Sequence, residues 1–254
     1  MDNNLFRLED LVNNPTARVP VCLCLDVSDT MNLVIEDDVQ TTGETVLVEG
    51  QECGVTTEGT PRHAEMVKGI EKFFDAVRAD EIAIEAAEIC IVTFGQKGAR
   101  LVQDFASIEQ SKLPKLVVGG ETPMGEGVNL ALDRLEARKE DYKRVGVDYY
   151  QPWLVLMTDG EANGDPSELS RAQSRATELV NGRRLTVFPI GIGNEAGMET
   201  LRRFSPRRPP LHLKNMNFQG FFEWLGKSVA QVSNSMPGES IKLDTDAISS
   251  WGEL

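Results

Sequence analysis

The sequence predicts one α/β domain built on a mostly parallel central sheet with helices on both faces. Short apolar runs rich in valine, isoleucine and leucine alternate with segments of helical periodicity along nearly all of the 254 residues. Most of these apolar runs are continuous, as expected of parallel strands that are covered on both faces. An apolar content of 41% at this length is enough for one substantial core, and no second domain or internal repeat is visible.

Six apolar segments have the length and composition of strands. The third follows the second after only the three residues Gln-Lys-Gly, which are too few for a crossover connection. We therefore expect it to be one short antiparallel strand at an edge of the sheet. The predicted strands are residues 18–26, 87–95, 99–105, 152–159, 185–193 and 210–215.

Four segments have the apolar spacing of amphipathic helices. Pro61, Pro123 and Pro166 lie where the first turn of a helix tolerates proline, and Gly182 lies where a helix end favours glycine. The predicted helices are residues 61–80, 123–142, 166–182 and 218–235.

An insertion at residues 33–60 separates the first strand from its helix by far more than the usual two to six residues. Alternating residues on either side of Gly50 predict an inserted β-hairpin. We expect residues 18–240 to form the domain, after a lead-in at residues 1–17. The tail at residues 241–254 is either an extended segment packed on the surface or disordered.

The charge balance excludes some classes of partner. Acidic residues outnumber basic ones by 40 to 26, giving a net charge of -14, which disfavours nucleic acid and favours a cationic partner or a metal. The first residues lack a basic segment followed by an apolar core, and no uninterrupted apolar run reaches the roughly 18 residues of a membrane span. We expect a cytoplasmic protein with no membrane contact.

The four cysteines do not predict a disulfide framework or a zinc site. Cys22, Cys24 and Cys90 lie inside apolar strand-like runs, where cysteine usually acts as a small buried hydrophobe, and Cys53 lies in the insertion. No Cys-x-x-Cys pair or histidine-rich spacing accompanies them.

Polar side chains follow three of the predicted core elements. Asp26, Ser28 and Thr30 come directly after the first strand, Thr122 lies in a glycine-rich loop that leads into a helix, and Asp159 ends another strand. Ligands of open parallel sheets collect outside the carboxyl ends of the strands. Three hydroxyls and two carboxylates are hard oxygen donors, which suit Mg²⁺ or Mn²⁺, whereas zinc favours nitrogen or sulfur. The five residues are therefore our predicted metal ligands.

Each cluster alone has a simpler explanation. Asp26 fits an Asx-turn or a helix cap, Thr122 fits the cap of the following helix, and Asp159 fits a turn. Their occurrence in order, each at the end of a predicted core element, favours one shared site.

The three clusters together resemble the von Willebrand factor A (VWA) family and its metal-ion-dependent adhesion site (MIDAS), which combines a D-x-S-x-S loop with a distant threonine and a distant aspartate. The segments GGETPMGEGVNLAL, YYQPWLVLMTDGE and FFEWLGKSVAQVSNSMPG are similar to the TerY-like, tellurium-resistance-associated branch of that family. The resemblance covers residues 18–240 apart from the insertion. In this chain Thr30 replaces the usual second serine, and Asp29 stands where glycine is common.

The resemblance implies a Rossmann-like VWA fold and a role in binding rather than catalysis. It implies that Ser28 and Thr30 coordinate the metal through their hydroxyls, Thr122 directly or through water, and Asp26 and Asp159 mainly through water. A metal held mostly by neutral hydroxyls would strongly attract a carboxylate supplied by a protein partner. The implied setting is a bacterial tellurite or chemical-stress resistance system.

The main alternative is a Mg²⁺-dependent phosphohydrolase on a similar sheet. There an aspartate after the first strand attacks phosphate and the residue two positions later acts as acid and base, but that position is Ser28 here. A second open question concerns the acidic residues Glu36, Asp37 and Asp38 of the insertion. One of them either fills the coordination position of the metal that is left open for a partner, or all three belong to a solvated surface hairpin; we favour the hairpin.

Overall fold

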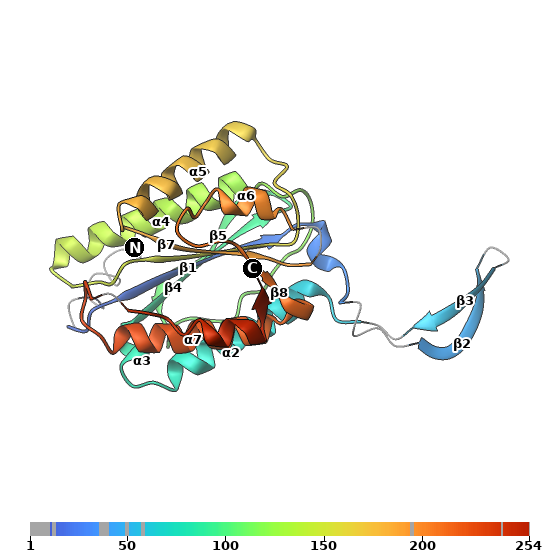
Figure 1. Ribbon diagram of the computed structural model, residues 1–254, viewed down its shortest axis with the longest axis horizontal. Coiled ribbons are helices and arrows are strands. Elements are labelled where there is room, and N and C mark those ends of the chain that lie inside the picture. The colour runs from blue at the N-terminus through green and yellow to red at the C-terminus, as the bar shows by residue number, and fades with distance from the viewer. Residues whose placement is uncertain are drawn as a thin grey trace, which may run out of the picture.

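The computed structural model describes residues 11, 14–35, 41–48, 51–56, 59–193, 196–239 and 241–253. A seven-stranded sheet forms the centre of the molecule, in the spatial order β5-β4-β1-β6-β7-β8-β9 (Figure 1). Its strands are β1 (Val19–Val27), β4 (Ala87–Gly95), β5 (Gly98–Ser107), β6 (Trp153–Thr158), β7 (Thr186–Gly191), β8 (Leu211–Leu213) and β9 (Gly252–Glu253).

The sheet is mostly parallel, as predicted. Strand β1 pairs in parallel with β4 and β6, and β6, β7 and β8 continue in the same direction. Strand β5 is the predicted antiparallel edge strand, and at ten residues it is longer than expected. A second antiparallel strand, β9, pairs with β8 at the opposite edge. It belongs to the C-terminal tail, where Leu243 and Trp251 are also buried, so the described part of the tail packs against the domain.

Helices cover both faces of the sheet (Figure 1). One face carries α2 (Arg62–Arg78), α3 (Ala83–Ala86) and α7 (Phe218–Ser233). The other carries α4 (Met124–Val145), α5 (Pro166–Asn181) and α6 (Met198–Arg202). The four long helices are the predicted ones, with ends shifted by up to three residues, whereas the short helices α3 and α6 were not predicted. The described residues also contain the short 3₁₀ helices η1 (Asp29–Asn32), η3 (Lys214–Met216) and η4 (Asp246–Ser250).

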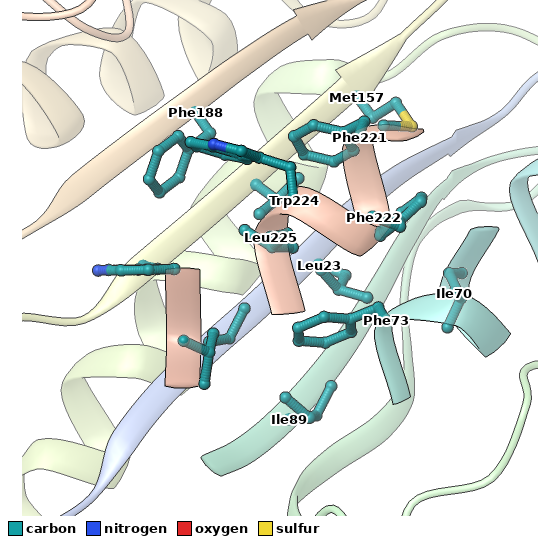
Figure 2. Close-up of a cluster of buried hydrophobic side chains, with 14 of the residues drawn as sticks. Leu23, Ile70, Phe73, Ile89, Met157, Phe188, Phe221, Phe222, Trp224 and Leu225 are labelled. Atoms are coloured by element: carbon teal, nitrogen blue, oxygen red, sulfur yellow. The ribbon is translucent and has the colours of Figure 1, made fainter. Parts of the chain in front are cut away.

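Strand β1 lies in the middle of the sheet and divides the core into two parts. Its alternate side chains point to opposite faces, so that Leu23 and Leu25 pack towards α2 and α7 whereas Cys22 and Cys24 pack towards α4 and α5. All nine residues of β1 are buried, which explains its continuous apolar sequence. Figure 2 shows the first of these parts, where aromatic side chains from α7 lie over the sheet.

The predicted hairpin is present in the insertion. Strands β2 (Thr41–Val48) and β3 (Gln51–Thr56) pair antiparallel and lie apart from the two helical layers (Figure 1). The two ends of the insertion meet at its base, where the Ile35 N–H donates to the Thr60 carbonyl at 3.0 Å. Glu36, Asp37 and Asp38, whose role was left open, lie outside the described residues.

Within the described part of the chain, no helix combines the length and apolar character needed to cross a membrane.

Candidate metal site

The first predicted cluster lies where β1 ends and the chain turns into η1. The carboxylate of Asp26 is fully buried, and its Oδ1 accepts a 2.8 Å hydrogen bond from the Ser28 backbone N–H. Its Oδ2 accepts a hydrogen bond from the hydroxyl of Thr158, the last residue of β6. The contact to Ser28 is the Asx-turn that the simpler explanation predicted. It also holds Ser28 beside the carboxylate.

The hydroxyls of Ser28 and Thr30 form a row that leads to the third cluster. Ser28 Oγ lies 3.1 Å from Thr30 Oγ1, and Thr30 Oγ1 donates to Asp159 Oδ1 at 2.7 Å. Asp159 is fully buried and Ser28 nearly so, whereas Thr30 is partly exposed. The structure therefore brings Asp159 together with the two hydroxyls and the carboxylate of the first cluster, from which it lies far away in the sequence.

The glycine-rich loop before α4 packs directly on the end of β1. The Gly119 N–H donates to the Val27 carbonyl at 2.8 Å, and the Asp29 N–H donates to the Gly120 carbonyl at 3.0 Å. Gly120 has a φ of +74°, and a Cβ there would lie 2.6 Å from Gln96 Cα. Glycine is needed at this position because any side chain would be both strained and in collision with backbone. The loop thereby holds the following residues against the site.

Thr122 reaches the same place from this loop. A Cβ built on Gly160 would lie 3.9 Å from Thr122 Oγ1 and 4.0 Å from Thr30 Oγ1, so the two hydroxyls border one small space. The Thr122 N–H donates to Asn163 Oδ1 at 2.6 Å, which clamps the loop to the segment after β6. Thr122 is not the helix cap that the simpler explanation predicted, because Pro123 occupies the cap position of α4.

The electrostatics of the site are unbalanced. The pKa of Asp26 is raised from 3.8 to about 6, mainly because its carboxylate is buried. Hydrogen bonds from Thr158 and Ser28 oppose this rise, and the nearby charge of Asp159 adds to it. Among the described residues, the ion pair found at the site is that of Arg62, whose Nη1 lies 2.8 Å from Asp159 Oδ2. In the described part of the chain, Arg62 therefore neutralises Asp159 and leaves Asp26 without an ion pair, so a bound cation would offset the remaining negative charge.

Three residues of this site were missed by the sequence analysis. Thr158 directly precedes Asp159 and Asn163 follows it by four residues in the sequence LMTDGEAN. For Thr158, the available signal was a polar residue near the end of an apolar strand. No sequence pattern around Arg62 indicated that it belongs to this site, because only the fold brings the start of α2 to the end of β6.

The donor set fits a hard divalent cation. All five predicted side chains offer oxygen only, and three of them are neutral hydroxyls. Across the described residues, no group of three or more histidine, cysteine, aspartate or glutamate side chains has the arrangement of a metal site. A site rich in nitrogen, sulfur or carboxylate is thus not found there, whereas the hydroxyl-rich cluster suits Mg²⁺ or Mn²⁺. That the five residues bind a metal stays a prediction.

Comparison with known proteins identifies the fold. A von Willebrand factor type A protein from Catenulispora acidiphila matches 85% of this chain and 43% of its own, with a TM-score of 0.54 at 16% identity. The von Willebrand domain of the type V pilus tip protein Mfa5 from Porphyromonas gingivalis matches 89% of this chain and 99% of its own, with a TM-score of 0.53 at 11% identity. Proximal thread matrix protein 1 of the mussel byssus matches 85% of this chain and 49% of its own, at a TM-score of 0.51 and 16% identity.

Sequence comparison is less informative. No protein-family model matches the sequence. The uncharacterized protein Rv2850c of Mycobacterium tuberculosis is 32% identical over 96 residues, which are 37% of this chain and only 14% of that protein. The chain thus spans a small part of that relative and about half of two of the three structures. At these identities the structural likeness establishes architecture, and the chain has the fold of a von Willebrand factor A domain.

Proposed function

We propose that this domain is a metal-dependent protein-interaction module whose Mg²⁺ or Mn²⁺ is held by five residues. They are Asp26, Ser28, Thr30, Thr122 and Asp159. The observation that supports this most is the convergence of three hydroxyls on two buried carboxylates at the carboxyl end of the sheet. Burial of two carboxylates is costly when, among the described residues, Arg62 alone forms an ion pair with them, and a divalent cation would offset that cost.

The neutral hydroxyls explain how such a site would bind a partner. A cation coordinated mostly through Ser28, Thr30 and Thr122 keeps much of its positive charge, and when bound it supplies a position for an external carboxylate. Asp26 accepts a hydrogen bond from the Ser28 backbone N–H, and Asp159 accepts one from the Thr30 hydroxyl, so the oxygens of both hydroxyls would remain free to bind the ion. The partner group would therefore be an aspartate or glutamate side chain of another protein.

We propose that the domain is not an enzyme. A phosphohydrolase of this type needs an acid and base two residues after the nucleophile, and Ser28 stands there with its hydroxyl 3.1 Å from that of Thr30. Purified protein with Mg²⁺ should leave a generic phosphomonoester intact. Metal-dependent turnover that disappears in Asp26→Asn would instead establish the hydrolase.

Affinity capture with and without a chelator tests the interaction directly. Tagged protein should retain a partner in Mg²⁺ and release it in EDTA, and Asp159→Ala should retain none in either buffer. Asp133→Ala is a matched control, because this exposed carboxylate of α4 pairs with Arg175 away from the site. Capture that is equal in both buffers and in both variants would contradict a metal-dependent interaction.

We further propose a cytoplasmic role in a tellurite or chemical-stress resistance system, which rests on the sequence resemblance to the TerY-like branch alone. A strain lacking this gene should grow less well in tellurite, and the parent gene should restore growth where Asp26→Ala does not. Cell fractionation gives the compartment. Unchanged tellurite tolerance in the deletion strain would remove the proposed setting without affecting the proposed metal site.

A further inference from the structure

Arg62 lies at the candidate metal site without being a possible metal ligand. It is the first residue of α2, and its Nη1 lies 2.8 Å from Asp159 Oδ2. The side chains of Arg62 and Asp159 are 13% and 0% exposed, so water screens this ion pair little. Within the described part of the chain, Arg62 Nε is buried and has no hydrogen-bond partner. The guanidinium is therefore held at this place mainly by one carboxylate.

That carboxylate connects Arg62 to the metal loop. Asp159 Oδ2 accepts from Arg62, and its other oxygen, Oδ1, accepts from the Thr30 hydroxyl at 2.7 Å. A metal ion coordinated through Thr30 would therefore share Asp159 with a second positive charge. Like charges this close, in a region of low exposure, repel each other appreciably.

The backbone also fixes Arg62 beside the metal loop. The Arg62 N–H donates to the Leu33 carbonyl at 3.0 Å, and the Leu33 N–H donates to the Thr30 carbonyl at 3.0 Å. These bonds close the base of the insertion, so the start of α2 cannot move away from η1 without breaking them. The fold therefore fixes the backbone of Arg62 beside η1, and the ion pair with Asp159 positions its guanidinium.

We propose that Arg62 is a positioning residue that weakens metal binding and strengthens the hold of the bound metal on a partner's carboxylate. By neutralising Asp159, Arg62 removes negative charge that would otherwise stabilise the ion, so the metal binds less tightly. The ion that does bind is less neutralised by the protein and attracts an external carboxylate more strongly. In the metal-free protein, Arg62 gives Asp159 the positive partner that it otherwise lacks. This inference rests on the proposed metal site.

Metal affinity measured on charge variants tests the proposal. Mn²⁺ binding is followed by electron paramagnetic resonance and Mg²⁺ binding by thermal shift, in the parent, Arg62→Gln and Arg62→Lys. We expect Arg62→Gln to bind Mn²⁺ about tenfold more tightly, because one positive charge near the ion is lost. Its Mg²⁺-induced rise in unfolding temperature should exceed that of the parent. Arg62→Lys keeps the charge and should bind close to the parental affinity, which a purely structural role would not predict.

Arg134→Gln is the matched control. It also breaks a partly buried arginine–aspartate pair, in which Arg134 Nη2 lies 2.6 Å from Asp104 Oδ2, but it leaves the metal loop intact. We expect parental Mn²⁺ affinity in this variant. Arg62→Met, which keeps the aliphatic stem, replaces Arg62→Gln if the glutamine variant does not fold.

The outcomes separate this inference from the proposed function. If the parent binds Mn²⁺ and Arg62→Gln binds it equally or more weakly, Arg62 has no such role although the metal site stands. If Arg62→Gln binds Mn²⁺ and the parent binds none, Arg62 itself excludes the metal, which supports the inference in its strongest form. If neither protein nor Arg62→Met binds Mn²⁺ or Mg²⁺, the metal site and the role of Arg62 both fail.

Discussion

Two buried carboxylate centres lie at opposite ends of the central sheet and are neutralised in different ways. At the amino end of β4, both oxygens of Glu88 accept hydrogen bonds from Arg138, at 2.7 and 2.8 Å. Glu88 also accepts from the Tyr142 hydroxyl at 2.6 Å, and Arg18 Nε lies 3.3 Å away. The Glu88 carboxylate raises the pKa of Arg138, although burial opposes this effect. This centre contains all the positive charge and the donors that its carboxylate needs.

Asp26 at the other end has no such partner. Its oxygens accept from one backbone N–H and one hydroxyl, and no ion pair with Asp26 occurs in the described part of the chain. Burial raises its pKa to about 6. A buried carboxylate that is fully paired holds helices and strands together, whereas one that lacks a cation is a place where a ligand can supply it. The contrast distinguishes a structural centre from a candidate binding site within one sheet.

The largest expected effect is the loss of the structural centre. Glu88→Ala leaves two buried arginines without their carboxylate and should lower the free energy of unfolding by about 3–5 kcal/mol. Urea denaturation gives this value. The same variant should keep the parental Mg²⁺-induced stabilisation, because Glu88 lies at the other end of the sheet; loss of that stabilisation would show that the two centres are not independent.

Removing the charge of Asp26 should affect metal binding more than stability. Asp26→Asn retains side-chain size and should lose the stabilisation by Mg²⁺, which in the parent amounts to about 2.7 kcal/mol at a metal concentration one hundred times the Kd. Without metal at neutral pH, the variant should be at least as stable as the parent, because its buried side chain carries no uncompensated charge. Denaturation with and without Mg²⁺ measures both effects, and an unchanged response to Mg²⁺ would remove Asp26 from the site.

The pH dependence of the metal-free protein should report the same unbalanced charge. The pKa of Asp26 is raised from 3.8 to about 6, so between these values the folded protein binds a proton that the unfolded chain does not. The contribution of Asp26 to stability should therefore fall as pH rises from 4 to 6, by roughly 2–3 kcal/mol. The difference in unfolding free energy between the parent and Asp26→Asn isolates this contribution. A difference that does not change over that range would contradict the raised pKa.

The smallest effect is expected from the hairpin, which belongs to neither centre. Replacing residues 36–58 with a short Gly/Ser linker keeps the hydrogen bonds at the base of the insertion, which the Arg62 N–H donates to the Leu33 carbonyl and the Ile35 N–H donates to the Thr60 carbonyl. Loop length costs little, so the unfolding free energy should change by less than about 1 kcal/mol and Mg²⁺ binding should remain. Capture of the partner then decides the role of the hairpin. Lost capture supports partner selection, enhanced capture supports inhibition by the acidic residues, and unchanged capture contradicts both.

The sequence by itself determined the architecture and the places where the site could lie. Continuous apolar runs identify strands buried on both faces, and the three-residue link before β5 requires an antiparallel pairing. Asp26 and Asp159 could be assigned to one end of the sheet because all parallel strands end on the same side, whereas Thr122 follows the antiparallel strand β5 and its assignment was supported by the family resemblance. These inferences depend on local periodicity and chain direction, which can be determined from short stretches of consecutive residues.

The tertiary structure decided which charges meet. Three contacts join residues from different elements: Arg62 with Asp159, Thr158 with Asp26, and Arg138 with Glu88. No local sequence pattern predicts such pairs. The same holds for β9, whose two residues pair with the distant strand β8. The physical reason is that the pKa of a carboxylate and its need for a cation depend on burial and on the nearest opposite charge, and packing sets both.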